Sequence, residues 1–303
     1  MSLAPRPADA AQAARRAEAL GARLPPLLVA AERVAATVAQ GVHGRRRVGQ
    51  GDSFWQFRSF LPGDPVNRID WRQSARSDRA FVRETEWEAA QTVCLWRDGG
   101  RSMRWRSRGQ AVDKIERAEL LLLALAALLL RGGERVSLIG SGHRAVSGRT
   151  GLERLAEQLS ELGDGEDGLP PESVLPRHGR VVLVGDFLAP LPRVQAVVGH
   201  MSAVPVTGHL VQILDPAEAL LPYEGRVRFA WQGDGRATAL ETLIPRVEGV
   251  REAYAERLAM QQEGLAAICS AARWRFSVHR TDHPPEAALL ALYSALSPEP
   301  GHR

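Results

Sequence analysis

Two aspartates closely follow apolar runs of the kind that form buried β-strands. Asp98 comes after the run 92–96, and Asp186 comes after the run 179–185. The carboxyl ends of parallel strands meet at one edge of a sheet, so we expect the two carboxylates to converge there. With the hydroxyl of Ser102, they are the hard oxygen ligands that Mg²⁺ prefers. This spacing indicates a candidate metal site made of Asp98, Ser102 and Asp186.

Both aspartates also suit a structural role, because Asp is common as a cap or turn residue where a strand leads into a helix. A metal-dependent hydrolase that uses Asp98 and Asp186 as ligands is the alternative function, but no motif supplies a positioned general base. Phosphate-cradling and dinucleotide-binding glycine motifs are absent from the sequence. We therefore expect no cofactor and no enzymatic activity.

A second group of charged and aromatic residues follows a Pro-Gly-Asp-Pro turn further upstream. In extended structure alternate residues share a face, so arginine forks there can hold a carboxylate while they stack on an indole ring. The pattern fits either an internal clasp that docks this segment on the rest of the chain or a surface that recognises a partner. The residues concerned are Asp64, Arg68, Asp70, Trp71, Arg72 and Arg76.

The elements that must position these residues alternate from residue 92 onward. Strands are expected at 92–96, 135–139, 179–185, 205–214, 227–231 and 275–279, and helices at 115–130, 152–162, 191–201 and 244–272. Such alternation predicts an α/β fold with a doubly wound, mainly parallel sheet that helices cover on both faces.

Changes in composition divide the chain into four segments. Residues 1–40 are expected to be an N-terminal helical lead, interrupted by a Pro-Pro pair. Residues 41–88 are rich in Gly and Pro between short aromatic runs, which predicts a small β-rich module. Residues 89–295 form the expected α/β domain, and residues 296–303 form a tail.

The charge of the chain is balanced, with 39 Lys and Arg against 35 Asp and Glu and a formal net charge of +4. Nearly all basic residues are arginine, which base composition explains as well as binding does, so we expect no nucleic-acid partner. The longest apolar run, 120–130, is shorter than the ~20 residues that cross a bilayer, and no signal-peptide pattern precedes it. Two cysteines cannot build a disulfide framework. These features predict a cytoplasmic protein without a membrane span.

A long motif runs through the middle of the chain. It reads Gly-Gln-Gly-Asp-Ser-Phe-Trp at 49–55, Pro-Gly-Asp-Pro at 62–65, Arg-Ile-Asp-Trp-Arg at 68–72, Ala-Arg at 75–76 and Asp-Pro-Ala-Glu at 215–218. The order of these elements resembles the bacterial domain-of-unknown-function family 58, over about residues 41 to 290. The segment from Asp98 to Ser102 is also similar to Asp-x-Ser-x-Ser, the metal-ion-dependent adhesion motif of von Willebrand factor A domains.

The adhesion motif is degenerate in this chain. Gly100 stands where the motif has its first serine, and Arg97 and Arg101 place positive charge beside the expected ion site. Two unit charges about 4 Å apart interact by about 4 kcal/mol in a partly screened setting, so an inward-turned arginine can occupy the place of the ion. The resemblance therefore implies a von Willebrand factor A-like fold with a weakened or empty site for Mg²⁺.

The family resemblance also implies a function. Its members are expected to be non-enzymatic adaptors that work with a MoxR-type AAA+ ATPase in the assembly or activation of client proteins. The contact surface would comprise the loops around Asp98 and Asp186 and the face from Arg68 to Arg76. Arg97 and Arg101 would then engage an acidic group of the partner directly.

The degenerate motif generates a first prediction. Millimolar Mg²⁺ should leave the melting temperature of the protein nearly unchanged, because a missing hydroxyl ligand and adjacent positive charge weaken cation binding. A thermal melt with and without MgCl₂ measures this. A rise of several degrees that Asp98→Ala abolishes would contradict it.

Overall fold

The structure is a computed structural model that describes residues 26–40, 54–60, 69–76, 79–85, 90–148, 150–162, 168–231 and 240–296. These residues belong to two compact units. Those between 42 and 90 form the smaller unit, and those up to 41 and from 91 onward form the larger one.

A five-stranded parallel sheet forms the centre of the larger unit. Its strands are β3 (Thr92–Arg97), β4 (Arg135–Leu138), β5 (Arg180–Gly185), β6 (Thr207–Leu214) and β9 (Arg275–Arg280), in the spatial order β4-β3-β5-β6-β9. The chain enters at β3, adds β4 on one side and then adds β5, β6 and β9 on the other. The strand order therefore reverses between β3 and β5, which is where doubly wound sheets bind ligands. The predicted α/β fold class is confirmed.

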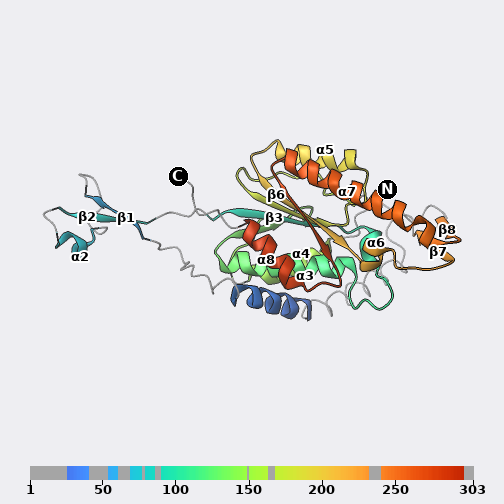
Figure 1. The fold of residues 1–303 in the computed structure, drawn as a ribbon. Helices are drawn as coiled ribbons and strands as arrows, with labels where there is room; N and C mark the ends of the chain where they lie inside the picture. Colours follow the sequence, from blue (N-terminus) through green and yellow to red (C-terminus); the bar gives the residue numbers. More distant parts are fainter. Residues whose placement is uncertain are drawn as a thin grey trace, which may run out of the picture. The chain divides into compact units, whose positions relative to one another are not determined.

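Helices cover both faces of this sheet (Figure 1). The elements are α3 (Lys114–Arg131), α4 (Gly151–Glu161), α5 (Leu191–Ser202), α6 (Pro216–Leu220), α7 (Arg251–Ala271) and α8 (Pro285–Leu296), with the short 3₁₀ turns η2 (Arg101–Arg104) and η3 (Val247–Val250). Helix α3 packs against α8 and α4, whereas α5 packs against α7. In Figure 1, α3 and α8 lie on the opposite side of the sheet from α5 and α7.

The apolar run of α3 is explained by its position. The helix contacts four strands as well as α4 and α8, so residues on every side of it are buried. Its start is fixed by a capping box, in which the Asp113 carboxylate accepts from the Glu116 amide and the Glu116 side chain accepts from the Asp113 amide. The first residue after this cap is Lys114, so the box sets the position of that side chain.

Residues 26–40 form a helix, as the helical lead predicts. Ala31, Val34, Ala35 and Val38 recur at helical spacing and are all buried. The helix therefore has one apolar face that is covered by the larger unit. The part of the expected helical lead up to residue 25 lies outside the described part of the chain.

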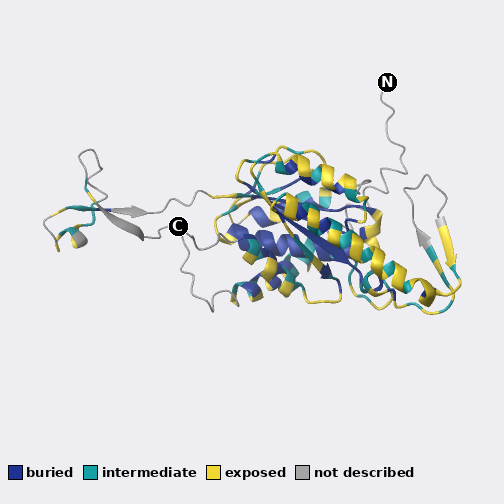
Figure 2. Ribbon diagram, turned by 45° about the horizontal axis from the view of Figure 1, so that its top comes forward, coloured by how far each residue is buried: buried dark blue, intermediate teal, exposed yellow. Residues whose placement is uncertain are grey.

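The strands carry the core of the larger unit, which is seen as dark blue arrows in Figure 2. Residues such as Val93, Val182 and Leu210 are 0% exposed, as expected for a parallel sheet covered on both faces. Gly208 in β6 lies directly under the indole ring of Trp274. A Cβ atom added at Gly208 would come within 2.0 Å of that ring, so only glycine fits there.

In the later part of the chain, one expected strand is present but pairs outside the parallel sheet, and one expected helix begins later than predicted. The strand expected at 227–231 exists as β7 (Val227–Trp231), but it pairs antiparallel with β8 (Leu240–Ile244) and not with the parallel sheet. The helix expected from residue 244 begins at Arg251, because Pro245 follows β8 and interrupts the apparent helical pattern. Helix α8 was not predicted.

The smaller unit contains an antiparallel pair, β1 (Phe54–Ser59) with β2 (Phe81–Thr85), and the single helical turn α2 (Trp71–Ser74). The turn is stabilised at both ends by Ser74. Its amide and its hydroxyl both donate to the Asp70 carbonyl, and the hydroxyl accepts from the Phe81 amide. The sequence predicts extended structure for residues 71–74, but these residues are helical.

No helix among the described residues is both long and apolar enough to cross a membrane. The long apolar run of α3 is explained by its burial within the larger unit.

The contact between Gly208 and Trp274 generates a stability prediction. Gly208→Ala forces a methyl group against the indole ring, and we expect it to lower the free energy of unfolding by about 1–3 kcal/mol, as overpacking does. Gly199→Ala in α5 is the matched control, because a Cβ atom there meets nothing within 4 Å. It should stabilise the protein by about 0.5–1 kcal/mol through helix propensity. Urea unfolding compares the two, and equal effects would contradict the packing argument.

Candidate functional site

Asp98 lies at the carboxyl end of β3, buried at the point where the strand order reverses. Its amide donates to the Val184 carbonyl of β5 at 2.8 Å, which extends the pairing of β3 and β5 by one residue. One carboxylate oxygen, Oδ1, accepts from the Gly100 amide at 2.7 Å. The other oxygen, Oδ2, accepts no hydrogen bond of standard geometry from the described residues, although the side chain is 0% exposed. A buried carboxylate with one oxygen unsatisfied is costly.

Asp186 lies at the matching position after β5. The two carboxylates therefore lie at the same edge of the sheet, as the sequence predicts. Its Oδ1 accepts from the Leu188 amide at 3.3 Å, and its backbone carbonyl accepts from the Gln212 side chain at 2.9 Å. Its Oδ2 lies 3.1 Å from the ammonium nitrogen of Lys114. Asp186 is therefore fixed by three separate elements.

Lys114 is the cation of this edge. Its ammonium nitrogen lies 3.1 Å from Asp186 Oδ2 and 2.6 Å from Glu218 Oε1, and the whole residue is 0% exposed. Sequence reasoning placed Arg97 or Arg101 beside the carboxylates and gave Lys114 no role. One signal was available, because Lys114 is the only lysine in a chain that otherwise uses arginine.

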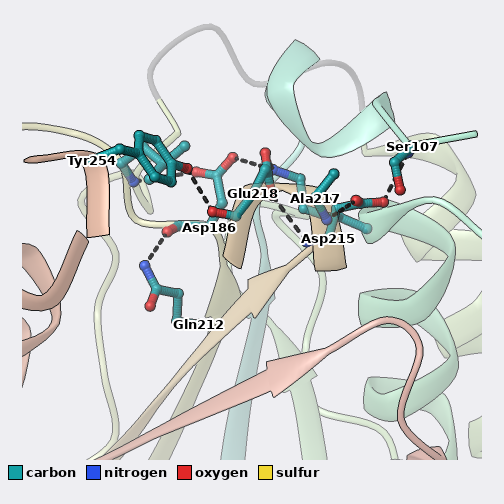
Figure 3. Close-up of polar contacts among 9 residues, drawn as sticks. Ser107, Asp186, Gln212, Asp215, Ala217, Glu218 and Tyr254 are labelled. Carbon is teal, nitrogen blue, oxygen red and sulfur yellow. Dashed lines mark hydrogen bonds and ion pairs between the residues drawn. The ribbon is translucent and has the colours of Figure 1, made fainter. Parts of the chain in front are cut away.

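Glu218 reaches Lys114 from α6, the five-residue helix after β6. A capping box builds this helix: Asp215 Oδ1 accepts from the Ala217 amide at 2.8 Å, and Glu218 Oε2 accepts from the Asp215 amide at 2.9 Å. The Glu218 backbone carbonyl accepts from the Tyr254 hydroxyl at 2.6 Å. Figure 3 shows these groups side by side with Asp186. The Asp-Pro-Ala-Glu motif therefore holds Glu218 against the lysine.

Asp215 also fixes the loop that follows η2. Its Oδ2 accepts from the Ser107 amide at 2.9 Å, and Asp215 itself is 0% exposed (Figure 3). Met103, also 0% exposed, holds the start of the same loop. The loop is thus anchored at two points, between which its other side chains face solvent.

Burial and like charge dominate the electrostatics of Asp98. Burial and the neighbouring charge on Asp186 raise the pKa of Asp98 from 3.8 to about 6, and the Gly100 and Asp186 amides and the Lys114 ammonium offset only part of this. The charges of Asp186 and Glu218 raise the pKa of Lys114 although its burial opposes this, so the ammonium stays protonated. Burial raises the pKa of Glu218 as well, but its 2.6 Å contact with the ammonium favours the ion pair.

Arg97 does not face this site. It is 5% exposed, its Nη2 donates to the Leu162 carbonyl at 2.9 Å, and its Nε lies 3.2 Å from Glu119 Oε1. The guanidinium therefore joins the end of α4 to α3. The expectation that Arg97 stands in the place of the ion, or reaches a partner from the surface, does not agree with this position.

Ser102 and Arg101 lie on the exposed side of η2. Gly100 separates the Asp98 carboxylate from the Ser102 hydroxyl: an added Cβ atom would lie 2.9 Å from Asp98 Oδ1 and 3.7 Å from Ser102 Oγ. A serine at position 100 would therefore displace the carboxylate as it now lies. Among the described residues no cluster of three or more His, Cys, Asp or Glu side chains has the arrangement of a metal site.

The turn η2 and the loop that follows it expose a dense set of basic and aromatic side chains. Trp105 is 42% exposed, which is high for a tryptophan. Its arginine neighbours are exposed as well. We call this segment the Arg/Trp loop, and its exposed members are Arg101, Arg104, Trp105, Arg106 and Arg108.

The smaller unit also carries predicted partner-binding residues. Trp71 is 65% exposed at the start of α2, and Arg72 and Arg76 are exposed beside it, whereas Asp70 is half-buried. The helical turn removes the alternating face on which Asp70 and Arg72 were expected to lie together. Asp64 and Arg68, the other two residues of the predicted surface, lie outside the described part of the chain.

Comparisons with known proteins identify relatives of the chain. Residues 56–264 match the family described as "Protein of unknown function DUF58". The "Uncharacterized protein Rv1480" of Mycobacterium tuberculosis and the "Uncharacterized protein Mb1516" of Mycobacterium bovis are each 26% identical in an alignment of 208 residues, with 63% of this chain and 63% of each relative covered. The matched region thus spans less than two thirds of the relatives' length.

Two solved structures were also found to be similar. An aerotolerance-related membrane protein of Bacteroides fragilis, carrying multiple mutations to serine, matches with a TM-score of 0.37 and 15% identity over 68% of this chain and 98% of its own. The conserved hypothetical protein BatB of Bacteroides thetaiotaomicron matches with a TM-score of 0.36 and 12% identity over 68% and 97%.

The pKa of Asp98 generates a prediction about pH. Because the folded protein binds this proton more tightly than the unfolded chain, the contribution of Asp98 to stability is complete below pH 3.8 and is lost as pH rises through about 6. The ionised group should cost about 3 kcal/mol at pH 7.5. Asp98→Asn should therefore raise the free energy of unfolding by about 1–2 kcal/mol at pH 7.5, after the cost of an unpaired amide N–H, and should not raise it below pH 4.

Urea unfolding of the wild type and of Asp98→Asn at several pH values measures this difference. Both proteins contain His209 and His279, which titrate in the same pH range, so their contributions cancel when the two stabilities are subtracted. Asp282→Asn is the control of opposite sign, because its partner Arg280 lowers the pKa of Asp282. That variant should lose stability at pH 7.5 and approach the wild type at low pH. The stability of Asp98→Asn minus that of the wild type should be larger at pH 7.5 than at pH 4. A smaller difference at pH 7.5 would contradict the argument.

Proposed function

Since this chain belongs to the DUF58 family of proteins of unknown function, its role must be inferred from its own surface, and we propose that it is a non-enzymatic adaptor that binds other proteins in the cytoplasm. The Arg/Trp loop is its contact surface on the larger unit. The partner we propose is a MoxR-type AAA+ ATPase, with which the protein assembles or activates a client. The support for that partner is the family resemblance of the motif described above.

The observation that carries the proposal is the exposure of four arginines and a tryptophan on one anchored loop. Arginine and tryptophan are the residues most enriched at the energetic centres of protein interfaces. The loop is held by the buried Met103 and by the bond from the Ser107 amide to Asp215, so its backbone loses little conformational entropy on binding. A surface that is already fixed in this way supports a recognition role.

The chemistry of the loop favours an acidic partner. A guanidinium is suited to hold a carboxylate with two parallel hydrogen bonds, and an exposed indole supplies apolar area at low entropic cost. An acidic protein segment that carries an apolar side chain offers both complements. In the smaller unit, Trp71 with Arg72 and Arg76 repeats the same combination and supports a second contact to the same kind of partner.

The arrangement of the buried groups gives less support to hydrolysis. The two oxygens of Asp186 are committed to the Leu188 amide and the Lys114 ammonium, and Glu218 is committed to Lys114 and to the Asp215 amide. Asp98, the remaining carboxylate, is 0% exposed. A substrate would have to displace these contacts before it reached a carboxylate.

A capture experiment tests the proposal. The tagged protein is incubated with native lysate of the source cells under ATP-trapping conditions, and bound proteins are identified by mass spectrometry. We expect a MoxR-type AAA+ ATPase, and we expect Arg101→Glu with Arg108→Glu to reduce its recovery at least tenfold, because charge reversal at an interface costs several kcal/mol. Failure to recover any such ATPase would refute the proposed partner.

The matched control reverses two exposed arginines outside the loop, Arg177→Glu with Arg226→Glu, which changes the net charge equally. Recovery should then stay near the wild-type level. Equal loss in both double variants would mean that overall charge, and not the Arg/Trp loop, attracts the ATPase. Oligonucleotide binding that falls steeply with salt would instead indicate a nucleic-acid binder.

A further inference from the structure

Lys114 is an exception within its own sequence. It is the single lysine among the 39 Lys and Arg residues, and its side chain is 0% exposed. An ammonium group is a compact point charge, whereas a guanidinium is broad and planar. The chain therefore has its one compact organic cation at the carboxyl edge of the sheet.

The contacts of Lys114 resemble those of a bound cation. The ammonium joins three elements that the sequence keeps apart: α3, the loop after β5 that carries Asp186, and α6 with Glu218. Each contact is to a carboxylate oxygen, at 3.1 and 2.6 Å. Removing one partner of such a buried pair leaves an uncompensated charge, which is strongly destabilising.

The residues of this edge do not fit the Mg²⁺ ion that the adhesion motif implies. Mg²⁺ needs near-octahedral oxygen ligands at about 2.0–2.1 Å, and it is bound through one or two carboxylates with water or substrate. Here Asp186 and Glu218 are spread around the ammonium, and Gly100 provides no hydroxyl. The described residues contain no cluster with the arrangement of a metal site.

We propose that the Lys114 ammonium is the resident cation of this edge and takes the place of a divalent ion, so that α3, the β5 loop and α6 are held together without dissolved metal. This inference does not depend on the proposed adaptor function. It concerns the cation that neutralises Asp186 and Glu218, and it applies whatever partner the protein binds.

Melting temperatures test it. Millimolar MgCl₂ or EDTA should leave the wild-type melting temperature unchanged. Lys114→Met, which keeps the length of the side chain and removes its charge, should lower it by about 10 °C because the buried Asp186 and the partly buried Glu218 lose their counter-charge. Adding Glu218→Gln to Lys114→Met should recover part of that loss, since Gln can still accept from the Asp215 amide and carries no charge.

Arg117→Met is the matched control on the same helix. Arg117 is also buried, but its contacts go to the carbonyls of Thr281 and His283 and to the His279 ring, and not to carboxylates. Glu218→Gln should therefore recover nothing in an Arg117→Met background. Equal recovery in both backgrounds would mean that Glu218→Gln is stabilising in general, and it would overturn the proposal.

The wild-type measurement decides the matter even if Lys114→Met does not fold. Melting that is independent of Mg²⁺ and EDTA supports a tethered cation. A melting temperature that rises with Mg²⁺ or falls with EDTA would overturn it, because a dissolved ion would then hold the edge together. Neither result depends on recovering an ATPase, so failure of this proposal and failure of the adaptor proposal are distinguishable.

Discussion

A single buried ammonium group organises the carboxyl edge of the sheet. The ammonium of Lys114 can be buried there only because two carboxylates approach it, and the Asp186 carboxylate can be buried only because the ammonium is present. The Asp113 capping box at the start of α3 and the Asp215 capping box at α6 bring the three groups together. The start of α3, the loop after β5 and the helix after β6 are thus held together by the ion pairs of Lys114.

The same edge contains a second buried carboxylate, Asp98, whose charge the nearby Lys114 ammonium and the Gly100 amide offset only in part. Asp98 is fully buried with one oxygen unsatisfied, next to a site whose only cation is shared by two other acids. Proteins commonly retain such costly groups where they function. The exposed Arg/Trp loop begins three residues after Asp98 and is anchored to the same edge through Asp215. A buried carboxylate and a set of exposed arginines therefore lie close together in the sequence at this edge of the sheet.

The sequence was sufficient to predict the fold class and the meeting of Asp98 with Asp186, because strand periodicity and parallel topology determine both. It was insufficient for the cation between the carboxylates. Spacing cannot show that Arg97 turns toward α4, or that a lysine from the start of α3 and a glutamate more than a hundred residues later meet. The hairpin β7–β8 was missed for a similar reason, since a short apolar run does not identify its pairing partner.

The burial of Lys114 has a consequence for regulation. Acetylation, methylation and ubiquitin attachment act on the side-chain amine of lysine, and the only such amine in this chain is enclosed in an ion pair at 0% exposure. Every other basic side chain apart from histidine is an arginine, whose charge is constant across physiological pH. Enzymes that modify lysine therefore have no target in the Arg/Trp loop, whose cations are all arginines.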